Sequence, residues 1–173
     1  MKPKVSIVMG SDSDLPVMKD AIDILEKFKI SYEVKILSAH RCPEETASFA
    51  KKALTKGIKV IIAGAGGAAH LAGVIASFFP LPVIGIPIKT STLNGLDSLY
   101  STVQMPPGVP VATVGINGAK NAALLAIEIL AVNDKKLEKK IKEYKSKMTE
   151  SVIKKSEKLN KLGVDKYLEL LKK

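Results

Sequence analysis

The sequence predicts an α/β protein, with a central parallel sheet covered by helices on both faces and a helical tail at the C-terminus. Short apolar, β-branched runs alternate with segments whose apolar residues recur at helical spacing. The loops between them are short, which favours right-handed crossovers between parallel strands. Ligands of such sheets bind at the carboxyl ends of the strands, so a site is expected in the segments that follow the strands.

The strands are predicted where runs rich in valine and isoleucine are bounded by glycine, proline or polar residues. Five runs fit this description, at residues 4–9, 31–37, 60–64, 83–88 and 110–116. The fourth run follows Pro80 and Pro82, which cannot continue the helix before it. Because a helical segment follows each run, the five strands are expected to be parallel.

Five helices are predicted between and after the strands, at residues 14–28, 43–57, 71–79, 97–104 and 121–130. Pro16 suits the first turn of the first helix, while Pro43 can open the second and Gly57 can close it. Residues 121–130 (NAALLAIEIL) carry one charge, at Glu128, so this helix is apolar almost all round. Such a helix is buried, and we expect it at a contact between subunits.

The tail from Asp134 is predicted to be helical and rich in lysine, with a break at Gly163. Residues 134–173 hold 14 lysines and 7 acidic residues, and therefore carry seven of the ten net positive charges of the chain. The acidic residues are interspersed, and aromatic side chains do not alternate with the lysines. We interpret this as a solvated helix face and expect no nucleic-acid partner. We expect a single domain over residues 1–173, with a core at about 4–133.

Composition narrows the class of protein further. Cys42 is the single cysteine, which excludes an internal disulfide and a multi-cysteine zinc site. No apolar run approaches the roughly 20 residues that span a bilayer, and the first apolar stretch reads as a strand, not a signal peptide. We therefore expect a cytoplasmic protein with no membrane partner. The sequence has no HExxH, EF-hand or Walker motif, so no metal site is expected.

The rarest charged side chains of the chain are neighbours. Arg41 is the one arginine among 27 basic residues, and it follows His40 in the segment SAHR after the second strand. A guanidinium group binds phosphate or carboxylate through two parallel hydrogen bonds that lysine cannot reproduce. Imidazole can both give and take a proton near pH 7. Both are candidate functional residues, although a surface arginine beside a capping histidine would look the same.

The segment GSDSD, residues 10–14, joins the first strand to the first helix. Serine hydroxyls and backbone N–H groups at a helix N-terminus suit an anion such as phosphate. Asp14 either caps the helix or accepts hydrogen bonds from ribose hydroxyls. An ordinary capped turn would contain the same residues, so this segment alone does not decide between them.

The glycine-rich segment that begins at Gly64 follows the third strand and ends at His70, the second histidine of the chain. Residues 64–69 match the loose dinucleotide pattern G-x-G-x-x-G/A, but residues 82–90 lack the acidic residue expected about 20 positions on. We therefore favour a loop of small residues that approaches a substrate closely, with main-chain N–H groups facing a carboxylate or carbon dioxide. The segments GSDSD, SAHR and AGAGGAAH should meet along one rim. A thiolate nucleophile at Cys42 is conceivable, but we interpret it as a small, half-buried residue.

Taken in order, GSDSD, SAHR, AGAGGAAHLAG, GIPI, LDSLYSTVQMPPGVPVATVGI and NAALLA resemble the signature stretches of the bacterial N5-carboxyaminoimidazole ribonucleotide mutases. The resemblance runs from about residue 4 to about residue 134. It implies a flavodoxin-like three-layer α/β/α fold and a homo-octamer with active sites near subunit contacts. It also implies conversion of N5-carboxyaminoimidazole ribonucleotide to 4-carboxy-5-aminoimidazole ribonucleotide in purine biosynthesis, without ATP, metal or organic cofactor.

The resemblance also implies a role for individual residues. His40 matches the catalytic acid/base, which would serve as the proton shuttle while the carboxyl group leaves nitrogen and is recaptured by carbon. Arg41 matches a phosphate-binding residue. The other substrate-binding positions that it implies are Ser11, Asp12, Asp14, Ser38, Ala65, Gly66 and His70.

Two alternatives stay open. A second class of the family carboxylates aminoimidazole ribonucleotide directly with carbon dioxide, and its members typically carry SAHK and lack GGAAH. Arg41 and the stretch 66–70 favour the mutases. Ala72, Cys42 and Asn94 depart from the commonest residues, yet none removes a group that the mechanism requires. The other alternative is a non-enzymatic nucleotide- or flavin-binding module on the same fold.

Overall fold

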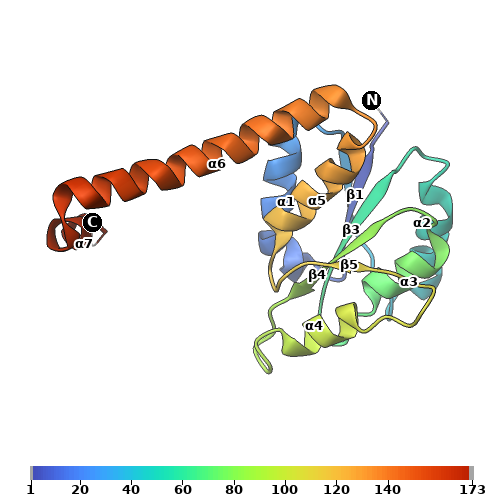
Figure 1. The fold of residues 1–173 in the computed structure, drawn as a ribbon. Coiled ribbons are helices and arrows are strands. Elements are labelled where there is room, and N and C mark those ends of the chain that lie inside the picture. Colours follow the sequence, from blue (N-terminus) through green and yellow to red (C-terminus); the bar gives the residue numbers. More distant parts are fainter. Residues whose placement is uncertain (1, 172–173) are drawn as a thin grey trace. The chain divides into compact units, whose positions relative to one another are not determined.

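The computed structural model describes residues 2–171, and the chain divides into two compact units between Leu130 and Ala131 (Figure 1). The first unit alternates strands and helices in the expected order. Its elements are β1 (Val5–Met9), the short helix η1 (Asp12–Asp14), α1 (Leu15–Phe28), β2 (Tyr32–Ile36), α2 (Pro43–Ala53), β3 (Val60–Gly66), α3 (Leu71–Phe78), β4 (Val83–Ile88), α4 (Leu96–Val103), β5 (Ala112–Thr113) and α5 (Ala119–Ala131). The division falls near the expected end of the core, while a single domain over the whole chain stays a prediction.

The first unit contains a parallel sheet of five strands in the order β2-β1-β3-β4-β5. β1 lies between β2 and β3, with Val5 opposite both Tyr32 and Val60. After β2 the chain returns across β1 to form β3, and from there the strands follow one another outward. This is the flavodoxin-like order, in which the reversal beside β1 opens a crevice at the carboxyl ends of the strands. The predicted parallel α/β fold is confirmed.

Helices cover both faces of this sheet, which makes the three layers (Figure 1). On one face α1 packs so closely on β3 that a Cβ atom added to Gly64 would lie 2.5 Å from Sδ of Met18. α5 lies on the same side and is joined to α1 by an ion pair between Lys120 and Asp20, with 3.8 Å between Nζ and Oδ1. On the other face, a Cβ atom at Gly85 of β4 would overlap the side chain of Thr102 in α4.

The core on the second face lies between the sheet and helices α2 and α3. Alternate residues of the strands point toward it, as the two-residue period of a strand requires. Burying one isoleucine of this kind is worth roughly 1.5–3 kcal/mol. The buried cluster consists of Val8, Phe49, Ala50, Ala53, Ile58, Ile61, Ala63, Leu71, Ala72, Ile75, Phe79 and Val83.

Several elements differ from the sequence prediction in length. α2 ends at Ala53, four residues before its predicted end at Gly57. β3 continues through Gly66, two residues beyond the predicted end. β5 contains only Ala112 and Thr113, whereas a strand was predicted over 110–116. β5 is an edge strand that pairs with β4 alone, and Pro110 before it has no N–H to donate to a ladder. For these two reasons β5 pairs with β4 over only two residues.

The apolar helix α5 is buried along one side only. Ala122, Ala126 and Ile127 are fully buried, whereas Leu125 and Ile129 are half-buried. Small alanine side chains allow the helix to approach the sheet closely. The larger apolar side chains keep part of their surface exposed, and a subunit contact there stays a prediction.

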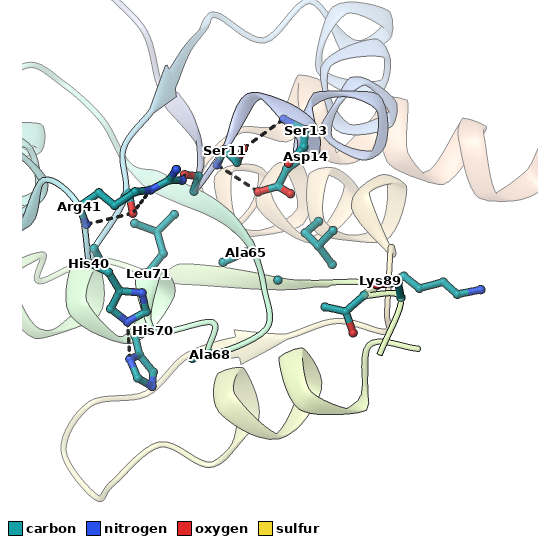
Figure 2. A pocket seen from close by; sticks show the side chains of 17 residues that line it. Ser11, Ser13, Asp14, His40, Arg41, Ala65, Ala68, His70, Leu71 and Lys89 are labelled. Carbon is teal, nitrogen blue, oxygen red and sulfur yellow. Dashed lines mark hydrogen bonds between the residues drawn. The ribbon is translucent and has the colours of Figure 1, made fainter. Parts of the chain in front are cut away.

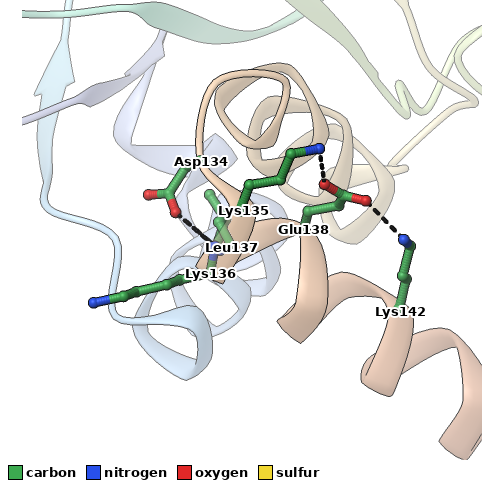
Figure 3. Close-up of polar contacts among 6 residues, drawn as sticks. All are labelled: Asp134, Lys135, Lys136, Leu137, Glu138 and Lys142. Carbon is green, nitrogen blue, oxygen red and sulfur yellow. Dashed lines mark hydrogen bonds and ion pairs between the residues drawn. The ribbon is translucent and has the colours of Figure 1, made fainter.

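The second unit contains the helices α6 (Lys135–Leu162) and α7 (Val164–Leu171), which meet at Gly163 as predicted. Gly163 has a φ of 77°, a conformation that glycine adopts readily. Asp134 caps α6 by accepting hydrogen bonds from the backbone N–H groups of Lys136 and Leu137 (Figure 3). No helix within residues 2–171 is long and apolar enough to cross a membrane.

Candidate active site

Four loops, each following one of the strands β1 to β4, meet at the carboxyl edge of the sheet and enclose a pocket of about 540 Å³ (Figure 2). The three segments expected to share one rim therefore do so. The pocket is lined by Gly10, Ser11, Ser13, Asp14, Ser38, Ala39, His40, Arg41, Ala65, Gly66, Ala68, His70, Leu71, Ile88, Lys89, Thr90 and Ser91. Of the predicted site residues, Asp12 does not line the pocket.

Residues 89–91, which follow β4, form a wall that the sequence analysis did not assign to the site. The signal for it was present, since the segment KTS follows the predicted strand 83–88 directly and the carboxyl ends of parallel strands share one edge. The side chain of Lys89 extends away from the pocket in Figure 2, so this residue contributes mainly its backbone. Lys89 N–H donates to Oδ1 of Asn117 at 2.8 Å, which fixes this part of the wall.

The two histidines are in direct contact at the rim of the pocket. Nε2 of His40 lies 2.8 Å from Nδ1 of His70, and the rings meet edge to face with centroids 4.9 Å apart (Figure 2). One nitrogen must donate and the other accept, so in this contact at least one of the rings is neutral. The sequence placed both residues on one rim, and the structure adds that the tautomers of the two rings are linked by this contact.

Arg41 reaches across from the β2 loop to the β1 loop. Its Nη2 donates to the carbonyl oxygen of Gly10 at 2.8 Å, and its Nε donates to Oγ of Ser38 at 3.3 Å. The backbone N–H of Arg41 donates to the same Oγ at 3.2 Å. These contacts orient the guanidinium group and leave others of its five donors for a ligand.

The turn that presents Ser38, His40 and Arg41 is held together by the thiol of Cys42. Sγ of Cys42 accepts from the N–H of Ser38 at 3.1 Å and donates to the carbonyl oxygen of Ser38 at 3.3 Å. Cys42 is half-buried, as the sequence analysis expected. Both bonds are local, so the thiol acts on the shape of the turn.

The segment after β1 forms a capping box. Asp14 Oδ2 accepts from the N–H of Ser11 at 3.2 Å, and Oγ of Ser11 accepts from the N–H of Ser13 at 3.3 Å. Asp12 accepts from Oγ of Ser11 at 3.1 Å, which places it behind the pocket wall. The N–H groups of Ser11 and Ser13 are thus already bonded, and an anion here would meet hydroxyl groups first.

Asp14 is the buried titratable group of this pocket, with 8% of its surface exposed. Burial raises its pKa above the usual value, while hydrogen bonds from Ser11 and Ser13 act in the opposite direction. The carboxylate of Asp14 closes the capping box whose N-cap is Ser11, but it makes no capping hydrogen bond to α1, so the predicted role of Asp14 as the cap of that helix is not observed. A ligand can reach Asp14 because it also lines the pocket.

The loop after β3 forms the wall of small residues that the sequence predicted. Ala65, Gly66 and Ala68 line the pocket, and Gly67 turns the chain with a φ of +67°. The N–H of Gly67 donates to Oγ of Ser98, and that of His70 donates to the carbonyl oxygen of Ala68. These two N–H groups are used within the protein and do not face a ligand. Within residues 2–171, no three His, Cys, Asp or Glu side chains are grouped as metal ligands.

Comparison with known proteins identifies the family. The AIR carboxylase family model matches residues 4–151. This chain belongs to the AIR carboxylase family. Among similar family members, the N5-carboxyaminoimidazole ribonucleotide mutase of Thermotoga maritima is 60% identical over 96% of this chain and 97% of its own length. The mutase of Pyrococcus abyssi is 61% identical over 96% of both chains.

Other members of the AIR carboxylase family are longer proteins. The phosphoribosylaminoimidazole carboxylase of Saccharomyces cerevisiae is 53% identical over 98% of this chain, which spans 30% of the yeast protein. Among solved structures, Treponema denticola PurE superposes with a TM-score of 0.84 at 33% identity, covering 91% of this chain and 98% of that one. This likeness confirms the flavodoxin-like α/β fold of the family for the present chain.

Proposed function

We propose that this chain is a mutase that converts N5-carboxyaminoimidazole ribonucleotide to 4-carboxy-5-aminoimidazole ribonucleotide in purine biosynthesis. The observation that carries the proposal is a single pocket in which His40 and Arg41 face a wall of small residues, Ala65 to Ala68. Relatives of matching length that carry the mutase name, at 60–61% identity, support the same reaction.

The phosphate and ribose of the substrate bind along the β1 and β2 loops. Arg41 is oriented by Gly10 and Ser38, and its remaining donors bind phosphate oxygens in a two-pronged way. The hydroxyl group of Ser38 accepts from Arg41 and keeps its own hydrogen to donate to the phosphate. The hydroxyl of Ser11 lines the same pocket and can donate to the phosphate only after it turns away from Asp12, and Asp14 accepts from ribose hydroxyls. Asp12 does not contact the substrate and instead orients the hydroxyl of Ser11 by accepting its hydrogen bond. This remote binding energy fixes the imidazole ring against the β3 loop.

His40 moves the one proton that each half of the reaction requires. In the first half, the bond between the exocyclic nitrogen and the carboxyl carbon breaks, carbon dioxide is released, and His40 donates a proton to that nitrogen. In the second half, ring carbon C4 forms a bond to the carbon dioxide, and His40 removes the proton from C4. The cycle restores the starting protonation of His40. His70 accepts from or donates to Nε2 of His40 and so fixes its tautomer.

The small residues of the β3 loop supply the space in which carbon dioxide is held between the two halves. Ala65 and Gly66 line the same pocket as His70, so the released molecule stays near C4. Holding it there replaces a bimolecular encounter by a positioned one and keeps water away. No ATP, metal or organic cofactor is required for these steps.

The same proposal covers assembly and location. We expect a homo-octamer in the cytoplasm that acts on a small-molecule ribonucleotide, without nucleic-acid or membrane partners. An apolar stripe on α4 and the loop before it supports assembly, because such surface is seldom left in water. The exposed residues of this stripe are Leu93, Leu96, Tyr100 and Val103.

Direct carboxylation of aminoimidazole ribonucleotide is a second candidate. Relatives from Candida glabrata and Schizosaccharomyces pombe favour it, because they are named phosphoribosylaminoimidazole carboxylase. Both are 54% identical to this chain, which covers 30% of their length. Both reactions give the same product, so only the substrate distinguishes them.

The deciding experiment supplies each substrate separately. Purified protein is mixed with fresh N5-carboxyaminoimidazole ribonucleotide in buffer stripped of bicarbonate and ATP, and the ultraviolet absorbance of the carbon-carboxylated product is followed. Rapid product formation is the expected result. Product only from aminoimidazole ribonucleotide plus bicarbonate would make the chain a direct carboxylase and overturn the mutase proposal. Yellow colour from bound flavin, with no product in either reaction, would indicate the binding module.

A further inference from the structure

The small-residue wall of the pocket is held from behind by helix α4, none of whose residues lines the pocket. Oγ of Ser98 accepts a hydrogen bond from the N–H of Gly67 at 2.9 Å. Oγ of Ser101 lies 3.3 Å from the carbonyl oxygen of Gly67, and 2.7 Å from its alternative acceptor, the carbonyl oxygen of Asp97. Helix α4 therefore contacts the peptide groups on both sides of Gly67.

The hydroxyl of Ser98 also binds a second wall of the pocket. It donates to the carbonyl oxygen of Ile88, at the end of β4, over 2.6 Å. Ile88 lines the pocket, as do Gly66 and Ala68 on either side of Gly67. A single hydroxyl, with 0% of the residue exposed, thus joins the carboxyl ends of β3 and β4. Its one hydrogen is donated and it also accepts a hydrogen bond, so it has little freedom to reorient.

Gly67 needs such support because of its backbone conformation. Its φ of +67° lies in the left-handed region, and a Cβ atom there would meet nothing within 4 Å. Space is therefore not the constraint at this position. A left-handed glycine between two flexible small residues adopts many conformations unless its peptide groups are bonded. The bonds to α4 select the one in which Gly66 and Ala68 face the pocket.

We propose that Ser98 is a positioning residue for the reaction, which holds the Gly67 peptide so that the wall beside His70 keeps the shape that retains carbon dioxide. The proposal rests on the mutase function proposed above. Ser98 touches no substrate, and its effect reaches the reacting atoms through Gly66 and Ala68. Displacement of a reacting partner by about 1 Å can lower a rate by roughly 100-fold.

The test compares Ser98→Ala with Thr102→Val. Thr102 lies one turn further along α4, is 2% exposed, and its hydroxyl donates to the carbonyl oxygen of Ser98 without contacting the pocket loops. Each variant removes one buried hydroxyl, but only Ser98→Ala releases Gly67. We expect kcat of Ser98→Ala to fall about 10- to 100-fold with KM changed less than about 3-fold, and Thr102→Val to stay within about 3-fold of wild type in both.

Amide hydrogen exchange of the peptide covering residues 64–70 gives a readout that does not depend on activity. We expect exchange there to be about 10-fold faster in Ser98→Ala, because Gly67 loses its acceptor, and unchanged in Thr102→Val. Equal losses of kcat in both variants, or wild-type kcat in Ser98→Ala, would overturn the positioning role. If the wild-type chain itself formed no product, the mutase proposal would fail, and the exchange rates would decide separately whether Ser98 holds the loop.

Discussion

At the scale of single residues, the proposed proton transfer depends on the contact between His40 and His70. Nitrogen atoms 2.8 Å apart share one hydrogen, so the tautomer of one ring sets that of the other. A carboxylate could hold the tautomer of His40 in the same way but would also stabilise its charged form. A second imidazole does not add a fixed charge, which suits the proposed role of His40 as both donor and acceptor of a proton.

The first prediction concerns the proton shuttle. His40→Asn should keep substrate binding, because the side chain is exposed at the rim and the proposed phosphate contacts come from other residues. Its turnover should fall by about 10²- to 10⁴-fold, the usual contribution of a positioned acid or base. Calorimetric titration with product and the steady-state rate separate the two effects. A rate near that of wild type would remove His40 from the proton transfer.

The second prediction concerns Asp14, whose burial raises its pKa. In the pH range between its ordinary pKa and the raised one, the folded protein binds more protons than the unfolded chain, so stability falls as pH rises through that range. Asp14→Asn has no charge to desolvate and keeps an oxygen to cap Ser11. The difference between the Tm of Asp14→Asn and that of wild type should therefore be more positive at pH 7 than at pH 3.5. The opposite order would show that Asp14 is stabilising as a carboxylate.

At the scale of elements, the rule that parallel strands end at one edge predicted most of the site. It brought residues 10–14, 38–41 and 65–70 together although they are far apart in sequence. The same rule covers residues 89–91, which were missed because no motif marked them. The role of α4 was not predictable from local pattern. Ser98 and Gly67 are 31 positions apart, and the sequence does not indicate which serine of a helix faces a loop.

The short strand β5 shows a second limit of sequence patterns. Its apolar residues fit a strand over 110–116, yet pairing requires a partner with matching donors and acceptors. Residues 112 and 113 pair with β4, and Val114 N–H bonds the carbonyl oxygen of Gly85, after which the chain turns. The spacing and composition of apolar residues in a sequence indicate which side chains are buried. The length of an edge strand depends instead on how its backbone pairs with the neighbouring strand.

The third prediction belongs to the start of α6. Asp134→Ala removes the acceptor of two backbone N–H groups, at a cost of about 0.5–2 kcal/mol in helix stability. Amides of residues 135–138 should exchange faster by about 2- to 30-fold, while those of α1 should not change. Glu157→Ala, at an exposed position near the C-terminal end of α6, is the control and should leave these amides unchanged. Equal effects of the two variants would contradict the capping role.

The ionisation of Glu138 in the same turn should be robust to acid. Its carboxylate bonds Lys135 at 2.8 Å and Lys142 at 2.7 Å, and these partners lower its pKa to about 2 (Figure 3). A depressed carboxylate pKa contributes stability that is present above the ordinary value and lost as pH falls toward the lowered one. The pair is exposed to solvent, so high salt should weaken it.

At the scale of the whole molecule, the fourth prediction concerns assembly. Light scattering should give a mass well above that of a dimer. Tyr100→Asp places a charge in the apolar stripe of α4, where 60% of the tyrosine is exposed in the single chain. This variant should shift the protein toward smaller species, whereas Lys59→Asp, on a different part of the fold, should not. A monomeric wild-type protein would contradict the octamer.

The central claim for the whole molecule is that one pocket releases and recaptures the same carboxyl carbon. The most direct test uses substrate labelled with ¹³C in the carboxyl group, in buffer that contains unlabelled bicarbonate, and measures the label in the product by mass spectrometry. We expect the product to keep the label, because the proposed mechanism holds carbon dioxide in the pocket lined by Ala65, Gly66 and His70 until C4 attacks it. Product with the isotopic composition of the bicarbonate would contradict it, since the carbon would then have come from solution.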